Sequence, residues 1–258
     1  MDRAAGIPDP RPVVIGISTK AYFGYQRTLD WLEEVARVAR SSPGIRDGSV
    51  QLFLAPAAPM LEAAVRLTAG TGVRIAAQDV SEHGPGAFTG DVDAALLAEL
   101  GVAIAEVGHA ERRRLHGETD EMVAAKAEAA RAAGLIPLVC VGERAPVAPA
   151  AAAEACLRQL ALVGPGPLLV AYEPVWAIAA AAPARPGHVR TVIHHLKRGL
   201  PAGSDGAAFL YGGSAGPGLL AALRPVVDGL FLGRFAHDPS VVATVLAEAE
   251  RRSETESL

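Results

Sequence analysis

Short apolar runs recur along the chain, and each is followed by a stretch in which apolar residues repeat at helical spacing. The runs are continuous rather than alternating in polarity, which is typical of parallel strands buried on both faces. We expect strands at residues 13–17, 50–54, 73–77, 102–107, 136–141, 168–171, 208–211 and 229–232. We expect helices at residues 28–40, 59–68, 92–100, 121–133, 151–162, 186–198, 219–224 and 241–251. Eight strand-then-helix units within about 250 residues predict an α/β chain folded as a (β/α)8 barrel.

An open, doubly wound sheet is the competing arrangement for such an alternation. That fold places a glycine-rich fingerprint after its first strand. The sequence Gly-Ile-Ser-Thr-Lys at 16–20 has no such fingerprint, which favours the closed barrel. No linker rich in Pro, Gly and Ser divides the chain, so we expect a single domain over residues 1–258. We expect an N-terminal extension at 1–12 and a charged C-terminal tail at 252–258 that frays.

The composition argues against several classes of function. Half of the 258 residues are hydrophobic, and the formal net charge is −4. This charge gives no electrostatic basis for binding nucleic acid or an anionic membrane. The two cysteines, Cys140 and Cys156, lack metal-ligand spacing and need not pair. So few cysteines are typical of a reduced, intracellular protein. Residues 1–12 lack the apolar core of a signal peptide, so we expect a soluble, cytoplasmic protein without a membrane partner.

Polar side chains follow several predicted strands, where barrel enzymes carry their catalytic groups. Lys20 follows the first strand, His109 the fourth and Glu173 the sixth. The glycine-containing turns at 211–214 and 233–234 offer backbone N–H groups suited to a phosphate. A cation, an imidazole and a carboxylate at one mouth predict proton abstraction beside the carbonyl of a phosphorylated substrate.

Glu173 suits the role of general base because it ends a short apolar strand beside a proline and an indole. Desolvation by such neighbours raises the pKa of a carboxylate toward the working pH. The segment 179–184 that follows reads Ala-Ala-Ala-Ala-Pro-Ala. It stands where a substrate-covering loop is expected, and it lacks the glycines that usually build one.

Three stretches, in order and at similar spacing, resemble the signature segments of the triosephosphate isomerase family: residues 107–113, 171–178 and 211–214. The resemblance runs from about residue 13 to residue 247. It implies the TIM barrel already predicted, an enzyme that needs neither cofactor nor metal, and a homodimer. The segment 86–91 resembles the loop by which subunits of this family interdigitate, and Thr89 at its tip is expected to reach the site of the partner.

The resemblance also implies a role for each site residue. Glu173 would move the proton between adjacent carbons, His109 would polarise the carbonyl, and Lys20 would supply positive charge to the enediolate. Glu111 would hold Lys20 in place by an ion pair. The phosphate would be bound by backbone N–H groups of Gly212, Gly213, Ser214 and Gly233.

Four positions in the site depart from the family pattern. Ser18 stands where the family has an asparagine, and Ala110 replaces the serine that follows the histidine. The lid begins at Ala179 and is alanine-rich, where the family has Gly-Thr-Gly-Lys-Thr-Ala. Alanine keeps the N–H that a phosphate needs but resists the positive φ that glycine accepts. Arg234 replaces the second glycine after the last strand, and it either contacts the ligand, obstructs the pocket or faces outward.

Three functions fit these observations. We favour an aldose–ketose type isomerase of this family that transfers a proton through an enediolate on another short-chain sugar phosphate, such as an erythrulose phosphate. The Ser18 and lid changes predict weak or absent triose turnover. The second function is triosephosphate isomerase itself, in glycolysis and gluconeogenesis. The third is a phosphosugar-binding protein without catalysis, against which the retained Lys20, His109 and Glu173 argue.

Overall fold

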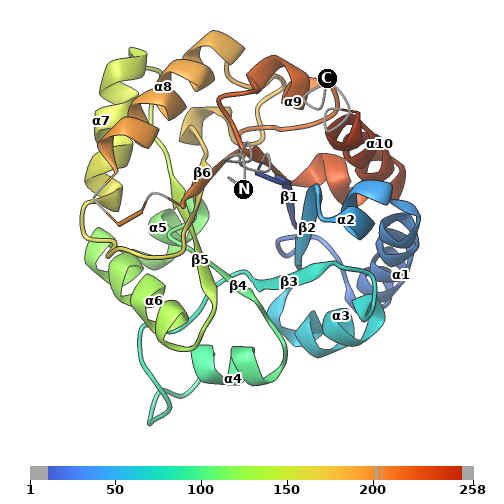
Figure 1. Cartoon of the computed structure of the whole chain (residues 1–258). Helices are drawn as coiled ribbons and strands as arrows, with labels where there is room; N and C mark the ends of the chain where they lie inside the picture. The colour runs from blue at the N-terminus through green and yellow to red at the C-terminus, as the bar shows by residue number, and fades with distance from the viewer. Residues whose placement is uncertain (1–10, 201–202, 205, 252–258) are drawn as a thin grey trace, which may run out of the picture.

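The computed structural model describes residues 11–200, 203–204 and 206–251, which form a closed barrel of parallel strands (Figure 1). Neighbouring strands pair in chain order, and β8 closes the barrel by pairing with β1. The strands are β1 (Val13–Ser18), β2 (Val50–Ala55), β3 (Arg74–Ala77), β4 (Ile104–Val107), β5 (Ile136–Val141), β6 (Leu169–Tyr172), β7 (Ala208–Tyr211) and β8 (Gly229–Leu232). The predicted TIM barrel is confirmed, and the alternative of an open sheet is wrong.

Helices form a ring outside the strands (Figure 1). They are α1 (Tyr25–Ser41), α2 (Pro43–Asp47), α3 (Leu61–Thr68), α4 (Ala94–Glu99), α5 (Ala110–His116), α6 (Asp120–Ala132), α7 (Pro149–Leu160), α8 (Pro186–Gly199), α9 (Leu219–Leu223) and α10 (Pro239–Glu250). Single 3-10 turns follow β2, β6 and β8: η1 (Ala58–Met60), η2 (Val175–Ala177) and η3 (Arg234–His237). Each predicted helix overlaps an observed one. The sequence does not predict α2 and α5, because neither segment has apolar residues that repeat at helical spacing.

Two apolar layers hold the barrel together. The larger layer lies between the strands and the surrounding helices. The smaller layer fills the barrel interior with Val14, Phe53, Ala55, Ala76, Ile104, Leu138, Cys140, Ala171, Leu210 and Phe231. The strands are therefore buried on both faces, which explains why they read as continuous apolar runs in the sequence.

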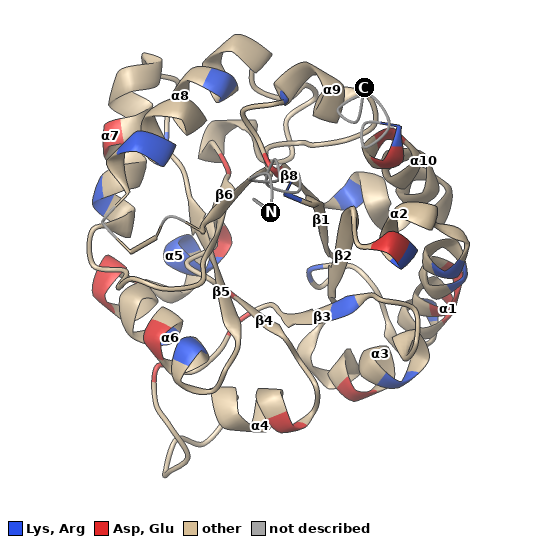
Figure 2. Ribbon diagram, viewed as in Figure 1, with Lys and Arg blue, Asp and Glu red and all other residues tan. Residues whose placement is uncertain are grey.

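Charged side chains lie mainly on the outer helices, where basic and acidic residues are interspersed (Figure 2). In the part of the chain that the structure describes, no helix is long and apolar enough to cross a membrane. The predicted N-terminal extension, apart from residues 11 and 12, and the predicted tail at 252–258 lie outside the described residues.

Candidate active site

The three predicted catalytic residues meet at the carboxyl end of the barrel. Lys20 lies just after β1, His109 just after β4 and Glu173 just after β6. Nε2 of His109 is 3.3 Å from Oε2 of Glu173. Nζ of Lys20 donates a hydrogen bond to Oε1 of Glu111 at 2.7 Å, which is the ion pair expected from the sequence. The topology thus brings the cation, the imidazole and the carboxylate to one mouth.

The carboxylate of Glu173 is held against backbone rather than against water. The residue is only 5% exposed. A Cβ on Gly212 would lie 2.4 Å from its Oε1, and a Cβ on Gly142 would lie 1.9 Å from its carbonyl oxygen, so both positions need glycine. Burial raises the pKa of Glu173 above its ordinary value, although the charges of His109 and Lys20 oppose this. A carboxylate with a raised pKa is a stronger base.

His109 is fixed in orientation by the helix that it begins. It is the N-cap of α5, and its Nδ1 accepts the backbone N–H of Glu111 at 3.0 Å. Because Nδ1 accepts a hydrogen bond, the ring proton of the neutral imidazole lies on Nε2. His109 therefore presents an Nε2–H donor on the side of Glu173, which is suited to a carbonyl oxygen.

Lys20 is a cation held in a strained turn. Its φ is 47°, and the side-chain amide of Gln78 donates to the carbonyl oxygens of Lys20 at 3.2 Å and of Ala55 at 2.8 Å. Burial lowers the pKa of Lys20, but the hydrogen bond to Glu111 and the charge of Glu173 outweigh it and raise the pKa overall. Lys20 therefore stays charged at neutral pH.

A cavity of about 350 Å³ lies between Lys20 and the ends of β6, β7 and β8. Most of the residues predicted to bind substrate or phosphate line it: Ser18, Ala179, Gly212, Ser214, Gly233 and Arg234. Gly213 is not among its lining residues, because its Cα packs toward the hydroxyl of Tyr211, where a Cβ would meet that oxygen at 2.5 Å. The combination of glycine backbone and one guanidinium makes this the candidate phosphate pocket.

Two side chains hold the start of the lid. Oγ of Ser214 lies 2.9 Å from the carbonyl oxygen of Ala177 and 3.1 Å from that of Ala180. Nη2 of Arg234 donates to the carbonyl oxygen of Ala179 at 3.4 Å. Arg234 therefore reaches the lid at the edge of the pocket, although the residue itself is exposed.

Backbone strain is concentrated around this pocket. Among the described residues, the non-glycine positions with positive φ are Lys20, Ala179 and Ser214, and all of them line the pocket. From the sequence, the alanines of the lid are expected to resist positive φ, yet Ala179 adopts a φ of 58°. The contacts from Ser214 and Arg234 to the lid backbone supply part of the support that such a conformation needs.

Thr89 does not join the other predicted site residues within one chain. It lies outside both cavities, in the exposed loop that connects β3 to α4 and projects from the barrel (Figure 1). The neighbouring Phe88 is exposed and stacks on His83, with the ring centroids 4.1 Å apart. The role predicted for Thr89 requires a second copy of the chain.

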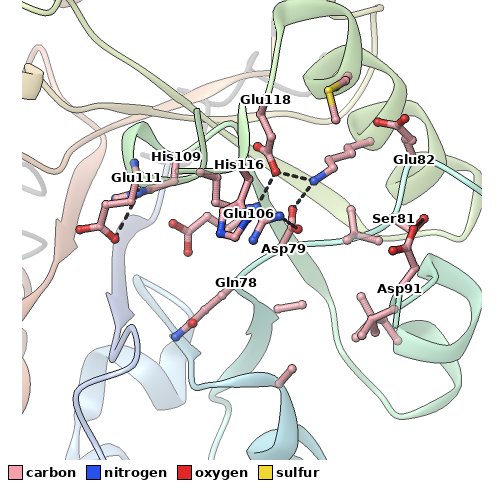
Figure 3. Close-up of a pocket in the computed structure, with 18 of the residues that line it drawn as sticks. Gln78, Asp79, Ser81, Glu82, Asp91, Glu106, His109, Glu111, His116 and Glu118 are labelled. Atoms are coloured by element: carbon pink, nitrogen blue, oxygen red, sulfur yellow. Dashed lines mark hydrogen bonds and ion pairs between the residues drawn. The ribbon is translucent and has the colours of Figure 1, made fainter. Parts of the chain in front are cut away.

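A second cavity, of about 610 Å³, adjoins the first and shares Ser18, Lys20 and Glu111 with it. Its wall comes from the ends of β3 and β4 and from α5 and α6 (Figure 3). Several polar residues that line this cavity are not among the site residues predicted from the sequence: Gln78, Asp79, Glu106, Glu118 and Lys126.

A buried ionic network closes one side of the second cavity. Nζ of Lys126 lies 2.8 Å from Oδ1 of Asp79 and 2.5 Å from Oε1 of Glu118. Arg112 pairs with the same two carboxylates. Burial raises the pKa of Glu118, but the hydrogen bonds from Lys126 and Arg112 lower it overall. The sequence holds a signal for this network, because Lys126 stands on the buried face of α6 that also contains Val123.

The fold and the site together define a (β/α)8-barrel isomerase. The chain belongs to the triosephosphate isomerase family, whose model matches residues 13–249. The L-erythrulose-1-phosphate isomerase of Pectobacterium atrosepticum is 44% identical over 249 residues, which cover 93% of this chain and 96% of that protein. The triosephosphate isomerase of Paracidovorax citrulli is 44% identical over 197 residues, which cover 72% of this chain and 78% of that protein. The triosephosphate isomerase of Thermus thermophilus is 40% identical over 218 residues, which cover 79% of this chain and 85% of that protein.

These similarities confirm the prediction of a family isomerase that acts on a short-chain sugar phosphate. They also confirm the prediction that the chain resembles family members acting on an erythrulose phosphate as well as the triose enzymes.

Proposed function

We propose that this protein isomerises the four-carbon ketose L-erythrulose 1-phosphate in preference to triose phosphates. The observation that carries the proposal is the extent of similarity. The L-erythrulose-1-phosphate isomerase matches over 96% of its length, whereas the triose enzyme of equal identity matches over 78%. The structure adds support, because the small Ser18 and the cavity beyond Lys20 leave room for one more carbon.

In the proposed mechanism, Glu173 is the base. In L-erythrulose 1-phosphate the carbonyl is at C2, C1 carries the phosphate, and C3 carries both a hydrogen and a hydroxyl. Glu173 removes the proton from C3, and His109 donates its Nε2 proton to the carbonyl oxygen, which gives a 2,3-enediol. Lys20 stabilises the negative charge that develops on these oxygens.

The second half of the reaction reverses these transfers on the neighbouring carbon. Glu173 returns the proton to C2, and the hydroxyl oxygen on C3 returns a proton to His109. The carbonyl then lies at C3, so the product is a ketose that carries its phosphate at the other end, erythrulose 4-phosphate. No atom is gained or lost. For a triose phosphate, the same steps interconvert a ketose and an aldose.

Binding of the phosphate is assigned to the pocket beneath the lid. The backbone N–H groups of Ser214 and Gly233 are the proposed donors, joined by the guanidinium of Arg234. Ala179 retains a backbone N–H that can close over the phosphate. The proposed reaction uses only these protein groups, without a cofactor or metal.

A homodimer in the cytoplasm is part of the proposal. Two features support the homodimer. The loop 86–91 is exposed, and the large cavity beside the active site could accept such a loop from a second copy of the chain. Thr89 would then reach Lys20 and His109 of the second copy. Light scattering at micromolar concentration is expected to give twice the monomer mass, and Phe88→Asp is expected to give a monomer. A wild-type monomer would contradict the proposal.

A direct assay tests the substrate. The kcat/KM for L-erythrulose 1-phosphate is compared with that for dihydroxyacetone phosphate, with product formation followed by proton NMR. The proposal requires the tetrulose to be the better substrate. A triose rate ordinary for the family, without tetrulose turnover, favours the alternative of triosephosphate isomerase. Phosphate binding without turnover of either compound favours a binding protein.

A further inference from the structure

Glu106 is a carboxylic acid in the interior of the barrel. It lies on β4, on the same face as Ile104, in a strand that is otherwise Ile-Ala-Val. The residue is only 3% exposed. A fully buried glutamate is rare unless it is paired with a cation, and the mechanism proposed above does not use this one.

The carboxyl group of Glu106 has few partners in the protein. Within the described residues, its Oε2 has no hydrogen-bond partner, and no lysine or arginine lies within ion-pair distance. Its Oε1 has a single weak contact, 4.0 Å from the thiol sulfur of Cys140. Burial raises the pKa of Glu106 well above its ordinary value, and the charge of Glu173 adds to this effect. Burying the carboxyl group of Glu106 therefore costs free energy that no hydrogen bond or ion pair described in the protein offsets.

Glu106 lies on the side of the site that is away from the phosphate pocket. It lines the larger cavity, together with Gln78 and His109, and not the cavity beneath the lid (Figure 3). The two cavities share Lys20 and Ser18. A substrate with its phosphate beneath the lid and its carbonyl at His109 therefore extends its far end toward Glu106.

The surroundings of Glu106 leave space for a small group. The interior positions of β2 and β3 include the small Ala55 and Ala76, and the end of β1 carries Ser18. On the adjacent strand β5, the larger Leu138 pairs with Glu106 and bounds this space on one side. A terminal hydroxymethyl group has the size and the polarity that such a space and a lone carboxyl group would accept. Its hydroxyl can donate to a carboxylate, or accept from a protonated carboxyl group.

We propose that Glu106 determines specificity by binding the hydroxymethyl group that a four-carbon ketose phosphate carries on its reacting carbon, C3, where dihydroxyacetone phosphate carries only a hydrogen. The inference rests on the proposed function and identifies the residue that would produce its substrate preference. With a triose phosphate the carboxyl group stays without this partner, as it is in the free protein, so only the longer substrate gains the contact.

The test compares both substrates in variants of Glu106. Glu106→Met keeps the length of the side chain and removes its polar atoms. It is expected to lower kcat/KM for L-erythrulose 1-phosphate by about 100-fold, and to change that for dihydroxyacetone phosphate by less than about 3-fold. Glu106→Gln keeps an acceptor oxygen and is expected to stay within about 10-fold of wild type on the tetrulose. If Glu106→Met does not fold, Glu106→Val carries the same test.

Ile104→Val is the matched control, because it alters the same face of β4 two residues before Glu106. It is expected to leave the ratio of the two kcat/KM values unchanged. An equal loss on both substrates in Glu106→Met, or no loss on either, overturns the role of Glu106 while the proposed function stands. A wild-type enzyme without tetrulose turnover overturns both.

Discussion

Nε2 of His109 lies 3.3 Å from Oε2 of Glu173, although the two residues follow strands that are not neighbours in the barrel. His109 is fixed by α5, the helix that it caps. Glu173 is fixed by Gly142 and Gly212, which lack the Cβ that would clash with it. A proton acceptor and a proton donor at this separation can act on a carbon and on the oxygen bonded to the next carbon of one substrate.

Glu173→Gln is expected to lower kcat by about 10²–10⁴-fold, because an amide cannot accept the substrate proton. Binding of a phosphosugar analogue is expected to change little, and the melting temperature is expected to rise. The raised pKa of Glu173 means that the buried carboxylate destabilises the fold at neutral pH, and the amide removes that charge. Steady-state kinetics, calorimetry of analogue binding and thermal unfolding measure the three effects. Unchanged turnover would remove Glu173 as the base.

The pH profile of kcat/KM should have its acid limb above the ordinary pKa of glutamate, which is about 4.3. Burial raises the pKa of Glu173, and the base works only when it is deprotonated, so activity falls as the pH drops through this raised value. Circular dichroism at each pH separates loss of activity from acid unfolding. A limb at or below the ordinary value would show that the charges of His109 and Lys20 outweigh burial.

Arg234→Gln is expected to raise KM for phosphorylated substrates by about 10-fold while kcat changes by less than about 3-fold. The variant loses a charged contact to the phosphate, worth about 1.5 kcal/mol or more, and the hydrogen bond to Ala179. Arg40→Gln is the control, because Arg40 is an exposed arginine in the last turn of α1, which runs away from the mouth. An unchanged KM would assign Arg234 to the lid alone.

Glu118→Gln is expected to lower the free energy of unfolding by about 3 kcal/mol, because it leaves Lys126 and Arg112 with one carboxylate between them. The folded-state pKa of Glu118 is lowered, so its contribution is present above its unfolded value near 4.5 and is lost as the pH falls toward the folded value. Urea unfolding of wild type and variant at pH 7 and pH 4 checks both parts. If the variant loses as much stability at pH 4 as at pH 7, the predicted pH dependence is wrong.

The barrel and the convergence of the three predicted catalytic residues could be predicted from the sequence, because topology alone places them. Parallel strands in chain order bring every strand end to one mouth, so Lys20, His109 and Glu173 meet without further information. Strand limits were predicted well for the same reason, since burial on both faces makes each strand an apolar run.

The direction of individual side chains could not be predicted. The orientation of the Arg234 side chain cannot be read from the sequence, because it depends on a hydrogen bond to the carbonyl oxygen of Ala179 in the lid. Ala179 was expected to avoid positive φ from its intrinsic preference, which contacts from other strand ends override. Glu106 is visible in the sequence as one acid in an apolar strand, but only the closed barrel shows that it lines a cavity beside the catalytic residues.

The three residues with positive φ around the candidate phosphate pocket, Lys20, Ala179 and Ser214, differ in what their side chains contribute. Glycine would relieve about 1 kcal/mol at each such position. At Lys20 the exchange would remove the cation, and at Ser214 it would remove the lid contact. At Ala179 it would remove only a methyl group. We therefore expect a substitution at Ala179 to change the conformational preference of the lid without altering the side chains of Lys20, His109 or Glu173.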